Sequence, residues 1–308
     1  MWRLAPLALC AWTRLADADT ASCIDGKPYD AKILRDRVGF LASKELDGRA
    51  PGTDGDKATR AFLVDQFRCL GLQPAFGTSY EQAFTADGQT TANVVGVIPG
   101  SDPTLAGDII MIAAHHDHLG GKHRGANDNA SGTVALLAVA QALQQRETKP
   151  KRTIVFAAFG SEETGMNGSY FYEKNAPAAL PVDRMVQVIN LDMVGSHDDF
   201  GYVAALGTFS GLAARKLLAR LDNKYPKVSV GYGGKARGSD FEPFCKKGVP
   251  YAFFWTPDRC YHKTCDLPDR LDYARMADIA SLAGDLALAM GDTTLDLAAA
   301  RSKRGCGI

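Results

Sequence analysis

Five short apolar runs, separated by stretches with helical periodicity, constrain the fold of this chain more than any other feature. The runs are rich in β-branched and aromatic residues and cover residues 93–98, 109–114, 154–159, 185–191 and 251–255. Several are apolar on both sides, as strands of a sheet covered on both faces are. Helices are expected near residues 132–145, 209–224, 240–247 and 273–290. This alternation predicts an α/β fold, a three-layer α/β/α domain with a central mixed, mostly parallel sheet.

The N-terminal third has a helical pattern of its own. From about residue 29 to Gly71, apolar side chains recur on one face, and Gly71 then stops the pattern. The chain has 308 residues, 46% of them hydrophobic, which is enough to fill a substantial core. Because no stretch has the composition of a linker, residues 19–308 are expected to form a single domain.

Residues 1–18 have the pattern of a secretory signal peptide. An early charge at Arg3 precedes an apolar run over residues 4–12, and Ala16-Asp17-Ala18 suits cleavage. We therefore expect a secreted or periplasmic protein. No later stretch reaches the ~20 apolar residues that a membrane-spanning helix needs.

The cysteines that follow this leader agree with an oxidising compartment. They form an even set, and their pairing is left open by the sequence, as is the alternative of buried free thiols: Cys23, Cys69, Cys245, Cys260, Cys265 and Cys306. Cys260 and Cys265 are close enough in sequence to close a small loop. Basic and acidic residues balance at 35 each, so the overall charge gives no reason to expect nucleic acid as a partner.

Acidic and imidazole side chains follow the ends of successive predicted strands. His115 comes after the second strand, the Glu162-Glu163 pair after the third, Asp192 after the fourth and His262 after the fifth. Ligand sites in open α/β sheets gather at the carboxyl ends of strands, so these side chains are expected to converge. Nitrogen and oxygen donors in this mixture suit zinc or a similar divalent ion.

The order of these motifs resembles that of the M28 metallopeptidase family over residues 47–268. The resemblance is carried by Gly48-Arg49-Ala50-Pro51-Gly52-Thr53, His115-x-Asp117, residues 125–132, Glu162-Glu163, Asn190-Leu191-Asp192 and Tyr261-His262. It implies a co-catalytic site with two Zn²⁺ per chain. His115 and Asp192 would bind one ion, Glu163 and His262 the other, and Asp128 would bridge both. Glu162 is implied as the general base.

Chemistry alone supports several of these roles. Asp117 is placed to accept the second N–H of His115, as an orienting carboxylate does. Neighbouring glutamate side chains leave the backbone in different directions, so one of the pair can bind metal while the other transfers protons. His116 and His118 are interpreted as pocket-wall or solvent residues.

The substrate side is less determined. Ser239-Asp240-Phe241 stands where the family commonly has Ser-Asp-His, and Phe241 is expected on the core face of a short helix. Tyr232 and Arg237, in a glycine-rich stretch, are candidates to stabilise the developing oxyanion.

The crowd of carboxylates favours an aminopeptidase, which acts on peptides with a free N-terminus. Arg237 and Arg259 keep a carboxypeptidase open as an alternative. Two further alternatives are a glutaminyl cyclase of the same fold and a non-catalytic binding domain.

Overall fold

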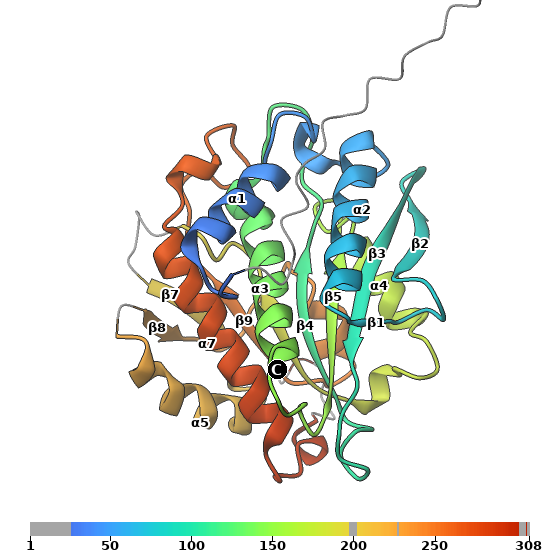
Figure 1. Ribbon diagram of the computed structural model, residues 1–308, viewed down its shortest axis with the longest axis vertical. Coiled ribbons are helices and arrows are strands. Elements are labelled where there is room, and N and C mark those ends of the chain that lie inside the picture. The colour runs from blue at the N-terminus through green and yellow to red at the C-terminus, as the bar shows by residue number, and fades with distance from the viewer. Residues whose placement is uncertain (1–25, 197–201, 227, 302–305, 307–308) are drawn as a thin grey trace, which may run out of the picture.

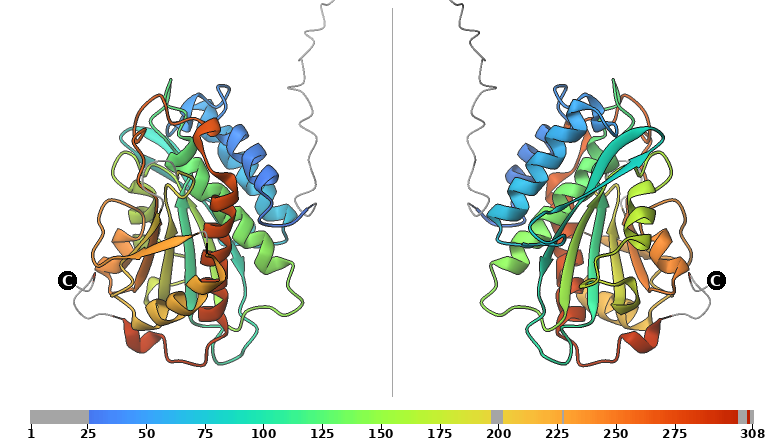
Figure 2. Two further views of the ribbon diagram at one scale, coloured as in Figure 1. Left: turned by 90° about the vertical axis from the view of Figure 1, so that its left-hand side faces the viewer. Right: turned by 90° about the vertical axis from the view of Figure 1, so that its right-hand side faces the viewer.

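The computed structural model describes residues 26–196, 202–226, 228–301 and 306. The expected signal peptide and Cys23 lie outside these residues. One nine-stranded sheet runs through the molecule, with helices on both of its faces (Figures 1 and 2). The predicted three-layer α/β/α architecture is confirmed.

The strands lie in the order β1-β3-β5-β4-β6-β9-β7-β8, and β2 also pairs with β3. Their bounds are β1 Gln73–Pro74, β2 Glu81–Ala86, β3 Gln89–Ile98, β4 Ile109–His115, β5 Thr153–Phe159, β6 Met185–Leu191, β7 Tyr202–Leu206, β8 Ser229–Tyr232 and β9 Tyr251–Trp255. Strands β5, β4, β6 and β9 are neighbours and mutually parallel. On either side of them, β3 joins β5 and β7 joins β9 by antiparallel pairing. The sheet is therefore mixed, with the parallel strands at its centre.

The helices divide between the two faces of the sheet. Their bounds are α1 Ala31–Leu41, α2 Asp54–Cys69, α3 Gly132–Gln144, α4 Asn167–Lys174, α5 Leu212–Leu221, α6 Glu242–Lys246 and α7 Tyr273–Asp292. Short 3₁₀ or π turns lie at Asp47–Arg49, Ala126–Ser131, Val182–Arg184, Asp222–Lys224, Pro268–Arg270 and Ala298–Ala300.

Alternate side chains of each central strand enter two separate hydrophobic cores. Ile110 and Ile112 of β4 belong to the core under α1, α2, α3, α5 and α7. Met111 and Ala113 belong to the core under α4 and α6. This two-residue alternation explains why the central strands read as continuous apolar runs in the sequence. Phe241 is fully buried in the second core, as expected, although it is the residue just before α6 and not part of the helix.

All five predicted strands form, whereas β1, β2, β7 and β8 were not anticipated. The N-terminal helical pattern is in fact two helices, because the chain turns between α1 and α2. Asp47, Gly48 and Arg49 there have φ of 44°, 69° and 55°, which no α-helix accommodates. The Thr53 hydroxyl then accepts the N–H of Asp56 and begins α2.

Two disulfides join described cysteines, Cys260–Cys265 and Cys245–Cys306. The expected small loop between Cys260 and Cys265 is thus confirmed. None of the described helices is both long and apolar enough to span a membrane.

The buried Arg152 ties the end of α7 to the start of β5. Its guanidinium donates to the carbonyl oxygens of Met290, Thr293 and Leu295 and to the Asp108 carboxylate. We expect Arg152→Met to lower the free energy of unfolding in urea by about 3 kcal/mol, because several buried acceptors lose their donor. Lys151→Met, at the neighbouring partly exposed position, is the control, and equal small losses in both variants would contradict this role.

Candidate metal centre

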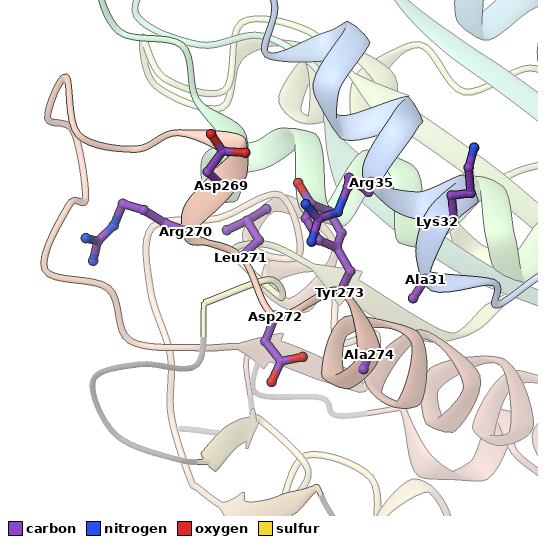
Figure 3. Close-up of a pocket in the computed structure, with 9 residues that line it drawn as sticks. All are labelled: Ala31, Lys32, Arg35, Asp269, Arg270, Leu271, Asp272, Tyr273 and Ala274. Atoms are coloured by element: carbon purple, nitrogen blue, oxygen red, sulfur yellow. The ribbon is translucent and has the colours of Figure 1, made fainter.

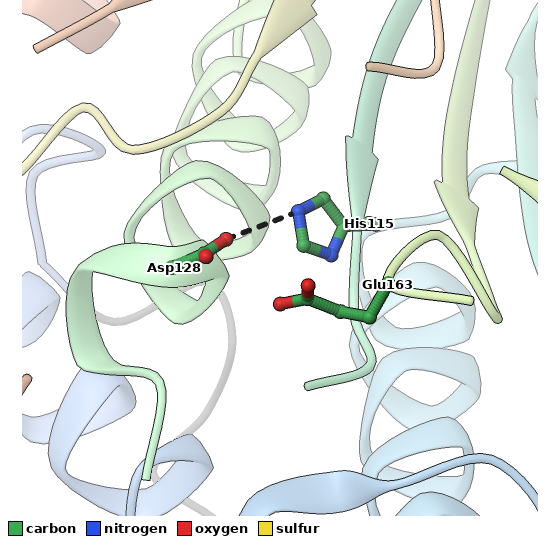
Figure 4. Close-up of side chains that lie close together, drawn as sticks. All are labelled: His115, Asp128 and Glu163. Carbon is green, nitrogen blue, oxygen red and sulfur yellow. Dashed lines mark ion pairs between the residues drawn. The ribbon is translucent and has the colours of Figure 1, made fainter. Parts of the chain in front are cut away.

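The carboxyl ends of the central parallel strands bring the sequence-predicted residues together. His115 ends β4, Glu162 and Glu163 follow β5, Asp192 follows β6, and the loop after β9 carries His262. Asp128 comes from the Ala126–Ser131 turn that leads into α3. Figure 4 shows the side chains of His115, Asp128 and Glu163 directed toward one another, and one donor atom from each lies within 4.8 Å of the others.

Asp128 lies between two pairs of donors. Its Oδ1 is 3.4 Å from His115 Nε2, which is also 3.3 Å from Asp192 Oδ1. Its Oδ2 is 3.2 Å from His262 Nε2, which is also 2.8 Å from Glu163 Oε2. One carboxylate thus offers each of its oxygens to a different imidazole–carboxylate pair.

Burial gives these groups strongly shifted pKa values. Burial, together with the neighbouring charge of Asp128, raises the pKa of Glu163 to about 8. Burial also raises the pKa of Glu162 well above its usual range, with the charges of Asp240 and Asp192 adding to the effect. Burial opposes protonation of His115, but the charges of Asp192 and Glu162 still raise its pKa. Burial also opposes ionisation of Asp128, but His115 and His262 still lower its pKa. The neutral forms of Glu162 and Glu163 are therefore favoured unless a cation stabilises their charge.

Glu162 lies at the edge of this cluster. Its Oε2 is 4.0 Å from His115 Nε2, and its side chain is 11% exposed. The Asp117 carboxylate accepts the backbone N–H groups of Glu162, at 3.0 Å, and Glu163, at 3.3 Å. Its Oδ1 lies 3.7 Å from His115 Nδ1, beyond hydrogen-bond distance, and the Asp117 atom that lies 3.3 Å from this Nδ1 is the backbone oxygen. Asp117 therefore positions the backbone of both glutamates as well as facing the imidazole.

Two asparagines attach the Asp128 segment to the segment after Asp192. Asn127 Oδ1 accepts the N–H groups of Gly195 and Ser196 at 2.8 and 3.1 Å. Asn129 Oδ1 accepts the N–H of Met193 at 3.1 Å, and its Nδ2 donates to Leu191 O at 3.0 Å. The residues on either side of Asp128 thus hold it against the end of β6.

Sequence reasoning missed Asp266, which holds the Asp128 segment from the other side. Its carboxylate accepts the N–H of Asn127 at 2.7 Å and that of Asp128 at 3.0 Å. Burial raises the pKa of Asp266 to about 6. The available signal was its place directly after the Cys260–Cys265 loop, which also contains Tyr261 and His262.

The other histidines of the motif have distinct surroundings. His118, expected as a pocket-wall residue, places Nδ1 2.5 Å from Glu163 Oε1, and burial lowers its pKa to about 4. A neutral His118 can donate this Nδ1 hydrogen and so orient Glu163. His116 Nε2 instead lies 3.0 Å from Ala92 O, away from the five clustered residues.

Arg49 connects the turn before α2 to this edge of the sheet. It is fully buried, and its guanidinium donates only to backbone carbonyls among the described residues, those of Leu41, His116, Arg124 and Gly125. Burial lowers its pKa to about 10, so it stays charged at neutral pH. The oxygens of His116 and Gly125 belong to the segments that follow His115 and precede Asp128.

Backbone strain accumulates at the same strand ends. Ser161, Met193 and His262 have φ of 60°, 59° and 55°, in the left-handed region that side chains other than glycine rarely adopt. Ser161 directly precedes Glu162, Met193 directly follows Asp192, and His262 is itself one of the clustered residues. Such conformations persist where the surrounding structure holds them, and they cluster at functional sites.

A pocket of about 340 Å³ opens beside the cluster. Asp192 and Tyr261 line it, and Arg237 lines it from the glycine-rich segment. Tyr232, the other candidate for the oxyanion, does not line this pocket, and its hydroxyl donates to Asp222 Oδ2 at 3.4 Å. The structure therefore brings Arg237, but not Tyr232, to the edge of the site.

A larger pocket, of about 630 Å³, lies between the N-terminal ends of α1 and α7 (Figure 3). It contains none of the clustered residues. Its charged side chains, such as Lys32 and Arg270, point away from one another. The cluster at the strand ends is therefore the stronger candidate for a functional site.

Sequence comparisons identify relatives of this chain. Residues 93–287 match the profile described as Peptidase family M28. The chain is 28% identical over 282 residues to leupeptin-inactivating enzyme 1 of Streptomyces exfoliatus, and this match covers 85% of this chain and 61% of that protein. It is 30% identical over 181 residues to aminopeptidase YwaD of Bacillus subtilis, and this match covers 56% of this chain and 37% of that protein. The chain thus spans less than two thirds of the length of these relatives.

Solved structures share the fold. A zinc aminopeptidase from Bacillus subtilis, BSAP, aligns with a TM-score of 0.73 at 17% identity, over 89% of this chain and 98% of that one. A glutaminyl cyclase from Porphyromonas gingivalis aligns with a TM-score of 0.67 at 22% identity, over 83% of this chain and 97% of that one. Both have the same arrangement of sheet and helices.

Asp266→Asn should weaken metal binding without unfolding the protein. An amide offers one acceptor oxygen where the carboxylate offers two, so the Asp128 backbone loses part of its support. We expect zinc affinity, measured against a competing chelator, to fall about tenfold to a hundredfold. Asp269→Asn, at an exposed position in the same loop, should leave it unchanged. Unaltered affinity in the Asp266 variant would remove this residue from the support of the site.

Proposed function

Because the chain belongs to peptidase family M28, we propose that it is a zinc-dependent exopeptidase that releases N-terminal residues from peptides. The observation that carries this proposal is the position of Asp128. Its two oxygens face two separate donor pairs, His115 with Asp192 and His262 with Glu163. A bridging carboxylate reduces the repulsion between two adjacent cations.

The donor set fits zinc. It consists of two imidazole nitrogens and three carboxylates, which are common zinc ligands in proteins. Asp128 Oδ2 is buried and accepts no hydrogen bond among the described residues, so it is available to a cation. We propose two Zn²⁺ per chain, held by His115 and Asp192, by Glu163 and His262, and jointly by Asp128.

Zinc at such a site acts as a Lewis acid, which polarises a carbonyl group and lowers the pKa of water. The protein contributes the proton transfers. Glu162, beside His115 but outside the two donor pairs, would take a proton from the attacking water and pass it to the leaving amine. Asp117 holds Glu162 in place through its backbone N–H. The 340 Å³ pocket beside Asp192 would receive the N-terminal residue of the substrate.

Cleavage assays distinguish this activity from its alternatives. We expect release from leucyl anilide and none from its N-acetylated form, loss of activity with a chelator, and recovery on adding zinc. Cleavage of N-blocked peptides from their C-terminus would instead indicate a carboxypeptidase. Cyclisation of a glutaminyl peptide would indicate a glutaminyl cyclase, and zinc binding without any turnover a binding domain.

Glu162→Gln tests the general base. The amide cannot accept the proton, so kcat on leucyl anilide should fall by about 10²- to 10⁴-fold. Zinc content should stay at the wild-type level, because Glu162 lies outside the donor pairs. Glu147→Gln, at an exposed site, serves as the control. Near-normal turnover by the Glu162 variant would remove this residue from the mechanism.

We also propose that the protein acts in a secreted or periplasmic location. The signal-like pattern of residues 1–18 supports this, as do the two disulfides between described cysteines, because disulfides persist in oxidising compartments.

A further inference from the structure

The pocket beside the proposed metal centre has mostly apolar walls and a single basic side chain in its lining, that of Arg237. The apolar lining comes from Met193, Leu206, Ala236, Phe253 and Trp255. The charged lining consists of Asp192, Asp258 and Arg237. Because Asp192 is a proposed zinc ligand and Tyr261 precedes another, a group in this pocket lies next to the reacting bond of a bound peptide.

Both carboxylates of the pocket already have donors. Asp192 Oδ2 accepts the Ser239 hydroxyl at 2.7 Å, and its Oδ1 faces His115. Asp258 accepts the Asn127 side-chain amide at 2.8 Å and the backbone N–H of Cys260 at 2.7 Å. Neither forms an ion pair with Arg237, so the acidic groups of the wall do not neutralise it.

The guanidinium of Arg237 differs from these two carboxylates. Among residues 26–196, 202–226, 228–301 and 306, no acceptor lies within hydrogen-bonding or ion-pair distance of its guanidinium. Its charge acts on Glu242, which forms its own ion pair with Lys246 at 2.7 Å. Arg237 is exposed, so its charge is available to a ligand in the pocket.

The backbone on both sides of Arg237 is anchored. The N–H of Ala236 donates to the Tyr251 hydroxyl at 3.1 Å, and the N–H of Gly238 donates to Glu242 Oε2 at 3.1 Å. Gly238 has a φ of 77°, which a glycine adopts without strain. The chain therefore holds the base of the Arg237 side chain at the pocket wall, and no described residue binds the guanidinium.

We infer that Arg237 binds a carboxylate of the substrate and makes this pocket selective for peptides that place one there. A guanidinium binds carboxylates through paired N–H donors, and the apolar walls cover the carbon chain beside it. The carboxylate has two possible sources, the side chain of an N-terminal aspartate or glutamate and the C-terminus of a dipeptide. The inference rests on the proposed exopeptidase activity, because that activity places the substrate beside Asp192.

Two substrate pairs test the inference and identify the source. Glutamyl anilide is compared with leucyl anilide, and leucyl-glycine with leucyl-glycinamide. In Arg237→Gln, kcat/KM for the carboxylate-bearing member of one pair should fall about tenfold or more relative to its neutral partner. The loss should appear mainly in KM, because the contact does not involve the reacting bond. Arg237→Lys should restore part of it.

Lys235→Gln is the matched control. It also removes a positive charge, two residues from Arg237, but the Lys235 side chain does not line the pocket. Unchanged ratios in both pairs, or equal losses in the Lys235 variant, would overturn the inference.

Calorimetry with L-glutamate and L-glutamine on the zinc-loaded protein gives a readout that does not depend on turnover. Wild-type protein should prefer L-glutamate if the side-chain carboxylate is the source, and Arg237→Gln should lose that preference. Activity on leucyl anilide with unchanged ratios would reject only the role of Arg237. If no peptide is cleaved, the proposed function is rejected. The binding data then decide the inference, which would fall if Arg237→Gln bound L-glutamate, L-glutamine and glycyl-glycine as tightly as the wild-type protein does.

Discussion

The repulsion among carboxylates held out of water at the ends of β4, β5 and β6 is the constraint on which the site depends. Two imidazoles are surrounded by four carboxylates, those of Asp128, Glu162, Glu163 and Asp192. Burial removes much of the water that would otherwise screen the repulsion between these carboxylates. Burial raises the pKa of both Glu162 and Glu163, and the charges of neighbouring carboxylates add to this effect. Cations bound between these groups would relieve the repulsion, which gives the cluster a physical reason to bind metal.

A polypeptide that brings such groups together has to oppose their repulsion with neighbouring contacts. On one side of Asp128, the side-chain oxygens of Asn127 and Asn129 accept backbone N–H groups of the segment after β6. On the other side, Asp266 accepts the N–H groups of Asn127 and Asp128. Asp117 holds the two glutamates through their own N–H groups. These supports are hydrogen bonds to the backbone, so they position the segments that carry the carboxylates without adding positive side chains that would compete with a metal.

The fold provides the frame for this arrangement. Parallel pairing of β5, β4, β6 and β9 places their carboxyl ends at one edge, and two hydrophobic cores pack against both faces of these strands. The substrate side is built differently. Arg237 and the pocket wall come from the segment between β8 and α6, so selectivity can vary there without disturbing the strands that carry the metal ligands.

By itself, the sequence determined the central strands, the layer architecture and the identity of the clustered donors. These follow from local patterns, because apolar runs and the residues directly after them are adjacent in the chain. It did not determine β7, which has only five residues, the edge strand β8, which has four residues and is only partly buried, or the break between α1 and α2. It also could not separate Tyr232 from Arg237: both lie in one glycine-rich stretch, but Tyr232 donates to Asp222 and does not line the pocket.

Only the tertiary structure decided that Asp266 supports Asp128, that His118 contacts Glu163 and that Arg237 has no partner among the residues that the structure describes. Each of these depends on atoms far apart in sequence, whose distances are set by packing and not by any local pattern.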